Sequence, residues 1–411
     1  MSSKAMARIG WIDEFKGFVL LLVCLYHVEQ AFPQAQMGML HLNALRMSAF
    51  FFISGMLFST RRFPDFKSYL VHKTRVLLIP YILLSLLFLA LDPVLYNFDL
   101  FPKAPRMTIM NIKPEIAGVW DYIYWNLAKI FVVGKSSIGS GPLWFVFTLY
   151  SVSLMFYSVQ WVAIHFFSQT RTEMPHQVRH DNKKAEKTES VSKLFIAVFA
   201  IISLAGGWLL YKNHVRLPLG IERDLTVLFF FACGWLCKTT VNKFTMDCFA
   251  TWARNDVGAL RNGTILAAAA IISFVTYACI EIPNPDFSIM NNTLGKSLPI
   301  FIASSFFGIA GLVAAFILAD KLPDIAPIRT VKGILRNISR NALVILAVHW
   351  YILLMMRLLF RSTFNKPGIA YLSIAIVTAG VIAAIPLFRC KLYKLLGKQP
   401  ASVRESLSIK N

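Results

Sequence analysis

Ten apolar segments constrain the fold of this chain more than any other feature of its sequence. A transmembrane helix needs about 20 mostly apolar residues to cross about 30 Å of hydrocarbon. The segments that approach this length are residues 17–32, 44–59, 76–92, 143–167, 194–211, 224–238, 264–281, 299–319, 342–360 and 369–388. Hydrophobic residues make up 56% of the 411 residues, which leaves too little polar surface to cover a soluble globule. The sequence therefore predicts an all-α polytopic membrane bundle of about ten transmembrane helices, with residues 1–411 forming a single membrane domain.

The basic residues alternate from loop to loop along the chain. Of the 42 Lys and Arg residues, 29 fall at Lys4, Arg8 and Lys16 or within 61–75, 171–193, 238–261, 321–340 and 389–411. Such an excess marks the cytoplasmic side of a multi-pass protein, and an even number of spans then places both termini there. A nucleic-acid site would not skip every second loop, so the net charge of +21 predicts no nucleic-acid partner.

Two of the connections are long. Residues 93–141 lie outside the cytoplasm by this orientation and contain "VWDYIYWNLAKIFVVG", a mixed aromatic and polar run typical of a short interfacial helix. Residues 168–193 are almost devoid of apolar side chains and predict a mobile charged cytoplasmic loop. His176 and His180 in that loop have metal-like spacing, but no Cys or carboxylate cluster accompanies them, so we expect no metal site.

Ionisable residues inside a membrane mark a functional path or a specific pairing. His27 follows Lys16 by 11 residues, which places it about 16 Å along the helix, near the bilayer midplane. His349 lies about 11 Å into a span that runs in the same direction. Two imidazoles at similar depth could share one cavity. The alternative for each is a neutral histidine that forms a hydrogen bond between helices.

One face of the first span carries an ionic cluster below the imidazole. At 100° per residue, this face holds Asp13, Lys16, Gly17, Leu20, Cys24 and His27. Asp13 is about 21 Å from His27 along the axis, too far to orient it, so it pairs with Lys16 or with a basic residue of another loop. Arg46 lies near the outer end of the second span, where it acts in the site or extends to the membrane surface.

Five motifs occur in order across these spans: "IDEFKGFVLLLVCLYH", "RMSAFFFISGMLF", "FKSYLVHKTRVLLIPY", "GPLWFVFTLY" and "SRNALVILAVHWYI". Together they resemble the acyltransferase-3 family of membrane O-acyltransferases, nearest to its fucose 4-O-acetylase-like branch. The resemblance covers nearly the whole chain. It implies transfer of an acyl group, commonly acetyl, from cytosolic acyl-CoA to a hydroxyl of an exported or cell-envelope carbohydrate.

The resemblance also implies roles for individual residues. His27 matches the essential histidine of the first span, and His349 matches a histidine of a late span. Lys16 lies at a position where many members have Arg, and Arg75 matches the family's basic motif before Pro80. Because CoA is polyanionic, we expect Lys16, Lys73 and Arg75 to contact the phosphates of the donor. The expected supporting residues are Asp13, Arg46, Ser54, Gly55, Trp144 and Asn341. We expect acetyl-CoA or another acyl-CoA as a donor substrate, no tightly bound cofactor, and a bacterial inner-membrane location.

The chemistry of acyl transfer agrees with a histidine at this depth. A sugar hydroxyl attacks well only when a base takes its proton, and histidine is suited to that step near neutral pH. A thioester is already activated and demands no metal. The rival interpretation is a proton-coupled secondary transporter, in which His27, Glu29, Arg46 and His349 relay protons or bind a solute at the midplane. A polytopic receptor or scaffold without catalysis is the third possibility.

Overall fold

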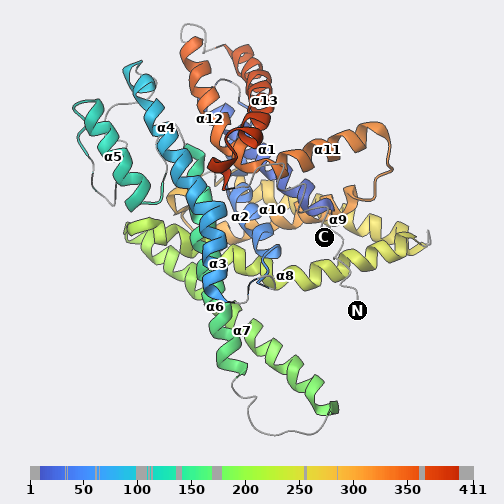
Figure 1. The fold of residues 1–411 in the computed structure, drawn as a ribbon. Helices are drawn as coiled ribbons and strands as arrows, with labels where there is room; N and C mark the ends of the chain where they lie inside the picture. Colours follow the sequence, from blue (N-terminus) through green and yellow to red (C-terminus); the bar gives the residue numbers. More distant parts are fainter. Residues whose placement is uncertain are drawn as a thin grey trace. The chain divides into compact units, whose positions relative to one another are not determined.

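The protein was analysed as a computed structural model. It describes residues 10–32, 34, 36–60, 63, 65–98, 109, 112, 114–135, 141–168, 178–253, 257–284, 286–360 and 366–397. Helices dominate this described part of the chain (Figure 1), which confirms the predicted all-α fold. The only named strands there, β1 (Phe287–Ser288) and β2 (Thr293–Leu294), form a two-stranded sheet.

The chain folds into two compact units. The first unit comprises Met1–Ile53, Thr239–Ser288 and Leu294–Leu387, and the second comprises Ser54–Lys238, Ile289–Thr293 and Phe388–Asn411. The helices α2 (Asn43–Met56), α8 (Ile221–Ala253) and α13 (Pro367–Cys390) each contribute residues to both units.

The first unit otherwise contains α1 (Gly10–Ala31), η2 (Met39–Leu42), α9 (Val257–Glu281), α10 (Leu298–Ala319), α11 (Ala326–Arg340) and α12 (Ala342–Leu359). Helices α9 and α10 pack along each other, and α1 packs against α10, α11 and α12. Gly17 permits the closest of these approaches, because a Cβ atom there would lie 2.0 Å from the Leu335 carbonyl oxygen. The sequence thus brings the first predicted span directly against the helices that follow α10.

The second unit otherwise contains α3 (Phe66–Lys73), η3 (Thr74–Leu78), α4 (Ile79–Asn97), α5 (Val119–Val132), η4 (Gly141–Leu143), α6 (Trp144–Ser168), α7 (Val178–Lys212), η6 (Pro218–Gly220), η7 (Ile289–Asn291) and η8 (Tyr393–Leu396). The segment η3 is a turn of π-helix between α3 and α4. Pro80 follows it, and a proline ring clashes with the carbonyl group four residues earlier in an ordinary helix. The wider π-turn relieves that clash, and the Ile79 amide donates to the Thr74 carbonyl.

Eight of the ten predicted spans correspond to described helices that are long and apolar enough to cross a membrane. These helices are Phe66–Val94, Gly141–His165, Ser190–Lys212, Pro218–Asp247, Arg261–Glu281, Leu298–Ala319, Ala342–Leu359 and Gly368–Cys390. The first two predicted spans are also helical but differ in kind. Helix α1 carries four charged side chains (Asp13, Glu14, Lys16 and Glu29), and α2 has only 14 residues. At 1.5 Å per residue α2 is about 21 Å long, which is shorter than the hydrocarbon core.

The two long connections contain helical structure. Helix α5 coincides with the aromatic run for which an interfacial helix was predicted within 93–141. In the charged segment 168–193, residues 169–177, with His176, lie outside the described residues, and the part from Val178 onward forms the start of α7. The mobility of that segment stays a prediction.

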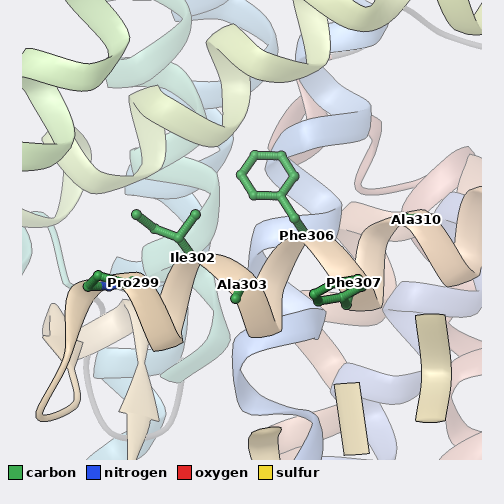
Figure 2. Close-up of a pocket in the computed structure, with 6 residues that line it drawn as sticks. All are labelled: Pro299, Ile302, Ala303, Phe306, Phe307 and Ala310. Carbon is green, nitrogen blue, oxygen red and sulfur yellow. The ribbon is translucent and has the colours of Figure 1, made fainter. Parts of the chain in front are cut away.

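A recess of about 530 Å³ lies along α10 (Figure 2). Its lining residues are Pro299, Ile302, Ala303, Phe306, Phe307 and Ala310. Figure 2 shows Ile302 and Phe306 projecting from one side of the helix. None of these side chains can exchange a proton or carry a charge, so the recess is unsuited to be a centre of acid–base chemistry.

Candidate functional site

Two histidines from opposite ends of the chain meet in the first unit. Nδ1 of His27 lies 2.8 Å from Nε2 of His349, and the two rings stack with their centroids 5.0 Å apart. His27 comes from α1 and His349 from α12, two helices that pack together. The side chain of His349 is fully buried, whereas His27 is partly exposed. The outer imidazole of the pair can therefore meet another molecule while the inner one supports it.

The backbone of α12 determines which nitrogen of each neutral ring carries a proton. Nδ1 of His349 lies 2.5 Å from the Ile345 carbonyl oxygen. Because a carbonyl oxygen only accepts, Nδ1 of His349 must donate, and its Nε2 is then an acceptor. Nδ1 of His27 must in turn donate to that nitrogen. This chain of hydrogen bonds leaves Nε2 of His27 with a lone pair that can take a proton from a third group.

Aromatic side chains next to each histidine enclose the outer imidazole. The ring of Tyr26 lies 5.4 Å from the His27 ring, and that of Trp350 lies 5.2 Å from it, measured between centroids. Each is the direct chain neighbour of one of the two histidines. The faces of these aromatic rings carry no strong hydrogen-bonding groups. They therefore do not compete for hydrogen bonds with the two ring nitrogens of His27.

Arg46 lies in the same unit and is buried, with only 4% of its surface exposed. It donates to the Met39 carbonyl and, over 2.5 Å, to Oδ1 of Asn43. Its guanidinium carbon stands 3.9 Å from the centroid of the Tyr26 ring, a cation–π contact. The side chain therefore does not extend to the surface, and it places a positive charge one ring away from His27.

Glu29 connects α1 to the short helix η2. Its carboxylate accepts from the amides of Gly38, over 3.1 Å, and Met39, over 2.6 Å. Gly38 has a φ of 71°, a conformation that glycine adopts without strain. The carboxylate of Glu29 thus stabilises the turn at Gly38 and Met39. Arg46 in turn donates to the Met39 carbonyl of that turn.

The first turns of α1 carry the predicted ionic cluster. Glu14 accepts from Nε of Arg336 over 2.9 Å and from Nη2 over 2.6 Å. Asp13 is also buried, with 7% of its surface exposed. Nζ of Lys16 lies 5.9 Å from the centroid of the Phe50 ring. A brace of this kind, between α1 and a basic residue of another segment, thus exists at Glu14. The pairing of Asp13 stays a prediction.

Asn341 occupies the junction between α11 and α12. Its amide group donates to the carbonyl oxygen and to Oδ1 of Asn337, over 2.9 and 2.8 Å. Only 3% of its surface is exposed. Asn341 therefore fixes the turn from which α12 carries His349 into the site.

The remaining predicted residues belong to the second unit. Gly55 allows α2 to approach α8, because a Cβ atom there would lie 1.9 Å from the Phe231 carbonyl oxygen. Ser54, its neighbour, is partly exposed. Nζ of Lys73 stands 5.3 Å from the centroid of the Tyr69 ring, and Arg75 is exposed on the π-turn. The expected donor contacts are thus divided, with Lys16 in the first unit and Lys73 and Arg75 in the second.

Trp144 begins α6 and contacts an arginine that the sequence did not single out. The guanidinium carbon of Arg223 lies 5.3 Å from the centroid of the Trp144 ring. Arg223 is 1% exposed, and its Nε lies 3.3 Å from Oδ1 of Asp224. The signal that could have identified it is "ERD" at the start of a predicted span, three ionisable residues at the edge of the hydrocarbon.

A comparison with protein families places this site in a known context. The acyltransferase domain of the acyltransferase-3 family matches residues 9–388, a range that includes both histidines and parts of both units. The chain belongs to the acyltransferase-3 family. It is a multi-pass membrane acyltransferase, and its family implies an acyl donor and an acceptor. No curated protein and no solved structure matches the chain.

Family membership gives the histidine pair a chemical context that the geometry alone does not supply. An acyltransferase must remove a proton from its acceptor, and the lone pair on Nε2 of His27 is suited to receive it. Within the described residues there is no group of three or more His, Cys, Asp or Glu side chains that could hold a metal ion.

Proposed function

We propose that the protein is an O-acyltransferase of the fucose 4-O-acetylase-like branch. It moves an acetyl group from cytosolic acetyl-CoA to a hydroxyl of an exported or cell-envelope carbohydrate. The observation that carries this proposal is the chain of hydrogen bonds from the Ile345 carbonyl through His349 to His27. It supports His27 as the general base, because it leaves Nε2 of that ring free to accept a proton.

In the proposed reaction His27 takes up one proton and returns it, and His349 supports the His27 ring. The acceptor hydroxyl gives its proton to Nε2 of His27 as its oxygen forms a bond to the thioester carbonyl carbon. The tetrahedral intermediate then breaks its C–S bond, and the departing CoA thiolate takes the proton from Nε2. While His27 is an imidazolium, its Nδ1 continues to donate to Nε2 of His349, which stabilises the charge. His349 thereby acts as a positioning residue.

The donor is the second element of the proposal. CoA carries several negative charges, and Lys16, Lys73 and Arg75 are the side chains that we assign to its phosphates. Arg75 is exposed and Lys73 partly exposed, as contacts of a soluble ligand must be. Asp13, Ser54, Gly55 and Asn341 are the residues that we assign supporting roles. The bacterial inner membrane is the location that fits a cytosolic donor and an exported acceptor.

The proposal is tested by acyl transfer in proteoliposomes. Wild-type protein and His27→Ala are supplied with radiolabelled acetyl-CoA and with glycans from the envelope of the source cell. We expect His27→Ala to lower the rate by about 10²–10⁴-fold, the usual contribution of a general base. His165→Ala, which removes an exposed histidine of α6, is the matched control and should keep the wild-type rate.

Two results would contradict the proposal. Equal transfer by His27→Ala and wild type would remove His27 from the chemistry. A proton-coupled solute flux without transfer of label would favour the transporter interpretation, in which both histidines relay protons. Bonds from Gly38 and Met39 already occupy the carboxylate of Glu29, which weakens its proposed part in such a relay.

A further inference from the structure

The second unit contains a group of basic side chains that the proposed chemistry does not use. Lys135 donates from Nζ to Oδ1 of Asn291 over 3.0 Å, and Arg216 donates from Nη1 to the Asn291 carbonyl over 2.5 Å. Asn291 therefore joins the segment after α5 to the segment before α8. Arg223 belongs to the same neighbourhood. Its Nη2 donates to the Leu219 carbonyl. That carbonyl lies close to Gly134, the residue before Lys135, because a Cβ atom on Gly134 would be 3.0 Å from its oxygen.

Arg223 has unused hydrogen-bonding capacity in a buried position. Its side chain is 1% exposed, and Nη1 has no hydrogen-bond partner among the described residues. Its other nitrogens contact Oδ1 of Asp224 and the Leu219 carbonyl, each over 3.3 Å. Oδ2 of Asp224 is likewise without a hydrogen-bond partner among the described residues. Buried polar groups are nearly always paired, so the Arg223 donor can bind one further acceptor. A guanidinium group is matched best by the oxygens of a carboxylate or a phosphate.

The turn before α8 is shaped around this arginine. Gly220 has a φ of 71°, and a Cβ atom there would lie 2.5 Å from Nη2 of Arg223. Leu219 has a φ of 60°, which is unusual for a residue with a branched side chain. Strained backbone of this kind persists where the surroundings require it, often at binding sites. The turn leaves room for the guanidinium group close to the backbone.

The charges around the arginine do not cancel. The described basic residues of this neighbourhood are Lys129, Lys135, Arg216 and Arg223, and the acidic ones are Asp92, Glu222 and Asp224. Glu222 lies 3.7 Å from Nη1 of Arg216 and also accepts from the Leu217 amide. When all seven side chains are ionised, four cations against three carboxylates leave one positive charge, and one anionic group would balance it.

We propose that Lys135, Arg216 and Arg223 bind one anionic group, a carboxylate or a phosphate, carried by the acyl acceptor. The assignment of this anionic group to the acyl acceptor rests on the proposed function. The loops that supply these residues, within 93–141 and 212–223, lie outside the cytoplasm in the orientation expected from the basic residues. CoA is cytosolic and belongs at the opposite surface, so the acceptor is the substrate that meets this cluster. The acceptor class is therefore an acidic glycan.

The test measures binding without any acyl transfer. Protein in phosphatidylcholine nanodiscs is titrated with D-glucuronate, and D-glucose serves as the neutral control sugar. We expect saturable binding of glucuronate and none of glucose. Lys135→Gln should weaken glucuronate binding about tenfold or more, because it removes a charge-assisted hydrogen bond. Lys212→Gln, at the end of α7 in the same unit, should bind like wild type.

Two further variants keep the test decisive. Arg223→Gln should abolish binding, and if it fails to fold, Lys135→Arg should restore the affinity that Lys135→Gln loses. The titration involves no acyl transfer, so a failure of the proposed catalysis leaves its result unaffected. Equal binding of glucuronate and glucose, or equal affinity of Lys135→Gln and wild type, overturns the proposal.

The source of the anion is tested separately. The titration is repeated in nanodiscs that contain phosphatidylglycerol. If phosphatidylglycerol stabilises the protein in a Lys135-dependent manner while glucuronate does not bind, the cluster holds a lipid headgroup, and its assignment to the acceptor is wrong. If glucuronate binds equally in both lipids, the acceptor assignment is supported.

Discussion

At the scale of single residues, His349 can be tested most directly, because its Nε2 accepts the hydrogen bond from Nδ1 of His27. His349→Leu removes the acceptor for Nδ1 of His27 and frees that ring to rotate or change tautomer. We expect the kcat of acyl transfer to fall by about 10²-fold, within the usual range for a general base that is no longer positioned. His349→Gln keeps an acceptor oxygen and should lose less. The KM for acetyl-CoA should stay unchanged in both variants.

A purely structural role for His349 predicts a different result. In that case His349→Leu and His349→Gln would both lower the stability of the protein, and the pH profile of the remaining activity would match that of wild type. Met355→Leu, a conservative change on the same helix, is the control for general perturbation of α12. Wild-type kcat in His349→Leu would show that the hydrogen bond between the rings has no part in catalysis.

Lys135 makes anion binding in the second unit dependent on pH. Burial lowers the pKa of its ammonium group to about 7, and the like charges of Arg223, Lys129 and Arg216 act in the same direction, against the opposing charge of Glu222. Lys135 is therefore charged below pH 7 and largely neutral above it. A sugar carboxylate is ionised throughout this range. We expect glucuronate to bind more tightly at pH 6 than at pH 8, as measured by calorimetric titration.

The control for this pH dependence is a variant whose charge does not change between pH 6 and pH 8. Arg keeps its proton at both pH values, so Lys135→Arg should bind glucuronate with similar affinity at pH 6 and pH 8. Lys135→Gln should show weak binding at both. Unchanged pH dependence in Lys135→Gln would mean that another group titrates.

The sequence could predict that the rings of His27 and His349 are able to meet, but it could not predict the ion pair at the start of α1. A rise of 1.5 Å per residue placed His27 and His349 at similar depth, and the structure brings the two rings together. The ion pair between Glu14 and Arg336 was not predicted, because it depends on where Arg336 arrives, 322 residues later in the chain. Helical periodicity defines a face, whereas packing decides which neighbour reaches it.

Among the elements, the crossing of α1 and α11 offers a direct test of how the first unit is assembled. Gly17→Ala would place a Cβ atom 2.0 Å from the Leu335 carbonyl oxygen. The helices must separate, and we expect a loss of about 1–3 kcal/mol in the free energy of unfolding, the usual cost of overpacking. Thermal unfolding in detergent, followed by intrinsic fluorescence, measures the change.

A glycine on α11 itself supplies the matched control. A Cβ atom on Gly333 would meet nothing within 4 Å. Gly333→Ala should therefore stabilise the helix by about 0.5–1 kcal/mol, because alanine loses less backbone entropy on folding. If Gly17→Ala and Gly333→Ala had the same effect, close contact between α1 and α11 would not contribute to stability.

The apolar segments were predictable as elements because hydrophobic length is a local property of the chain. The π-turn at η3 was not predicted, although Pro80 was visible in the sequence, because a proline can kink a helix, end it or widen it. The helical character of 178–193 was missed for another reason. Its many charged residues argue against a buried core, but Lys, Glu and Ala are also strong helix formers.

At the scale of the whole molecule, the number of membrane crossings depends on the first two helices. Helix α1 has 22 residues and is about 33 Å long, enough to cross the hydrocarbon core. Three of its four charged residues lie in its first two turns, where they can reach the membrane surface, and Glu29 accepts two backbone hydrogen bonds. These features favour a first span despite the charge, with the turn before α2 on the outer side.

Cysteine labelling in intact cells distinguishes ten crossings from eight. After replacement of the six native cysteines, Leu40→Cys introduces a thiol at a position that is 51% exposed, between α1 and α2. We expect a membrane-impermeant maleimide to label it without permeabilisation, as it should label Tyr124→Cys on α5. Met246→Cys, in the segment expected to be cytoplasmic, should react only after permeabilisation. If Leu40→Cys behaved like Met246→Cys, α1 would not cross the membrane, and His27 would have to meet its acceptor from the cytoplasmic side.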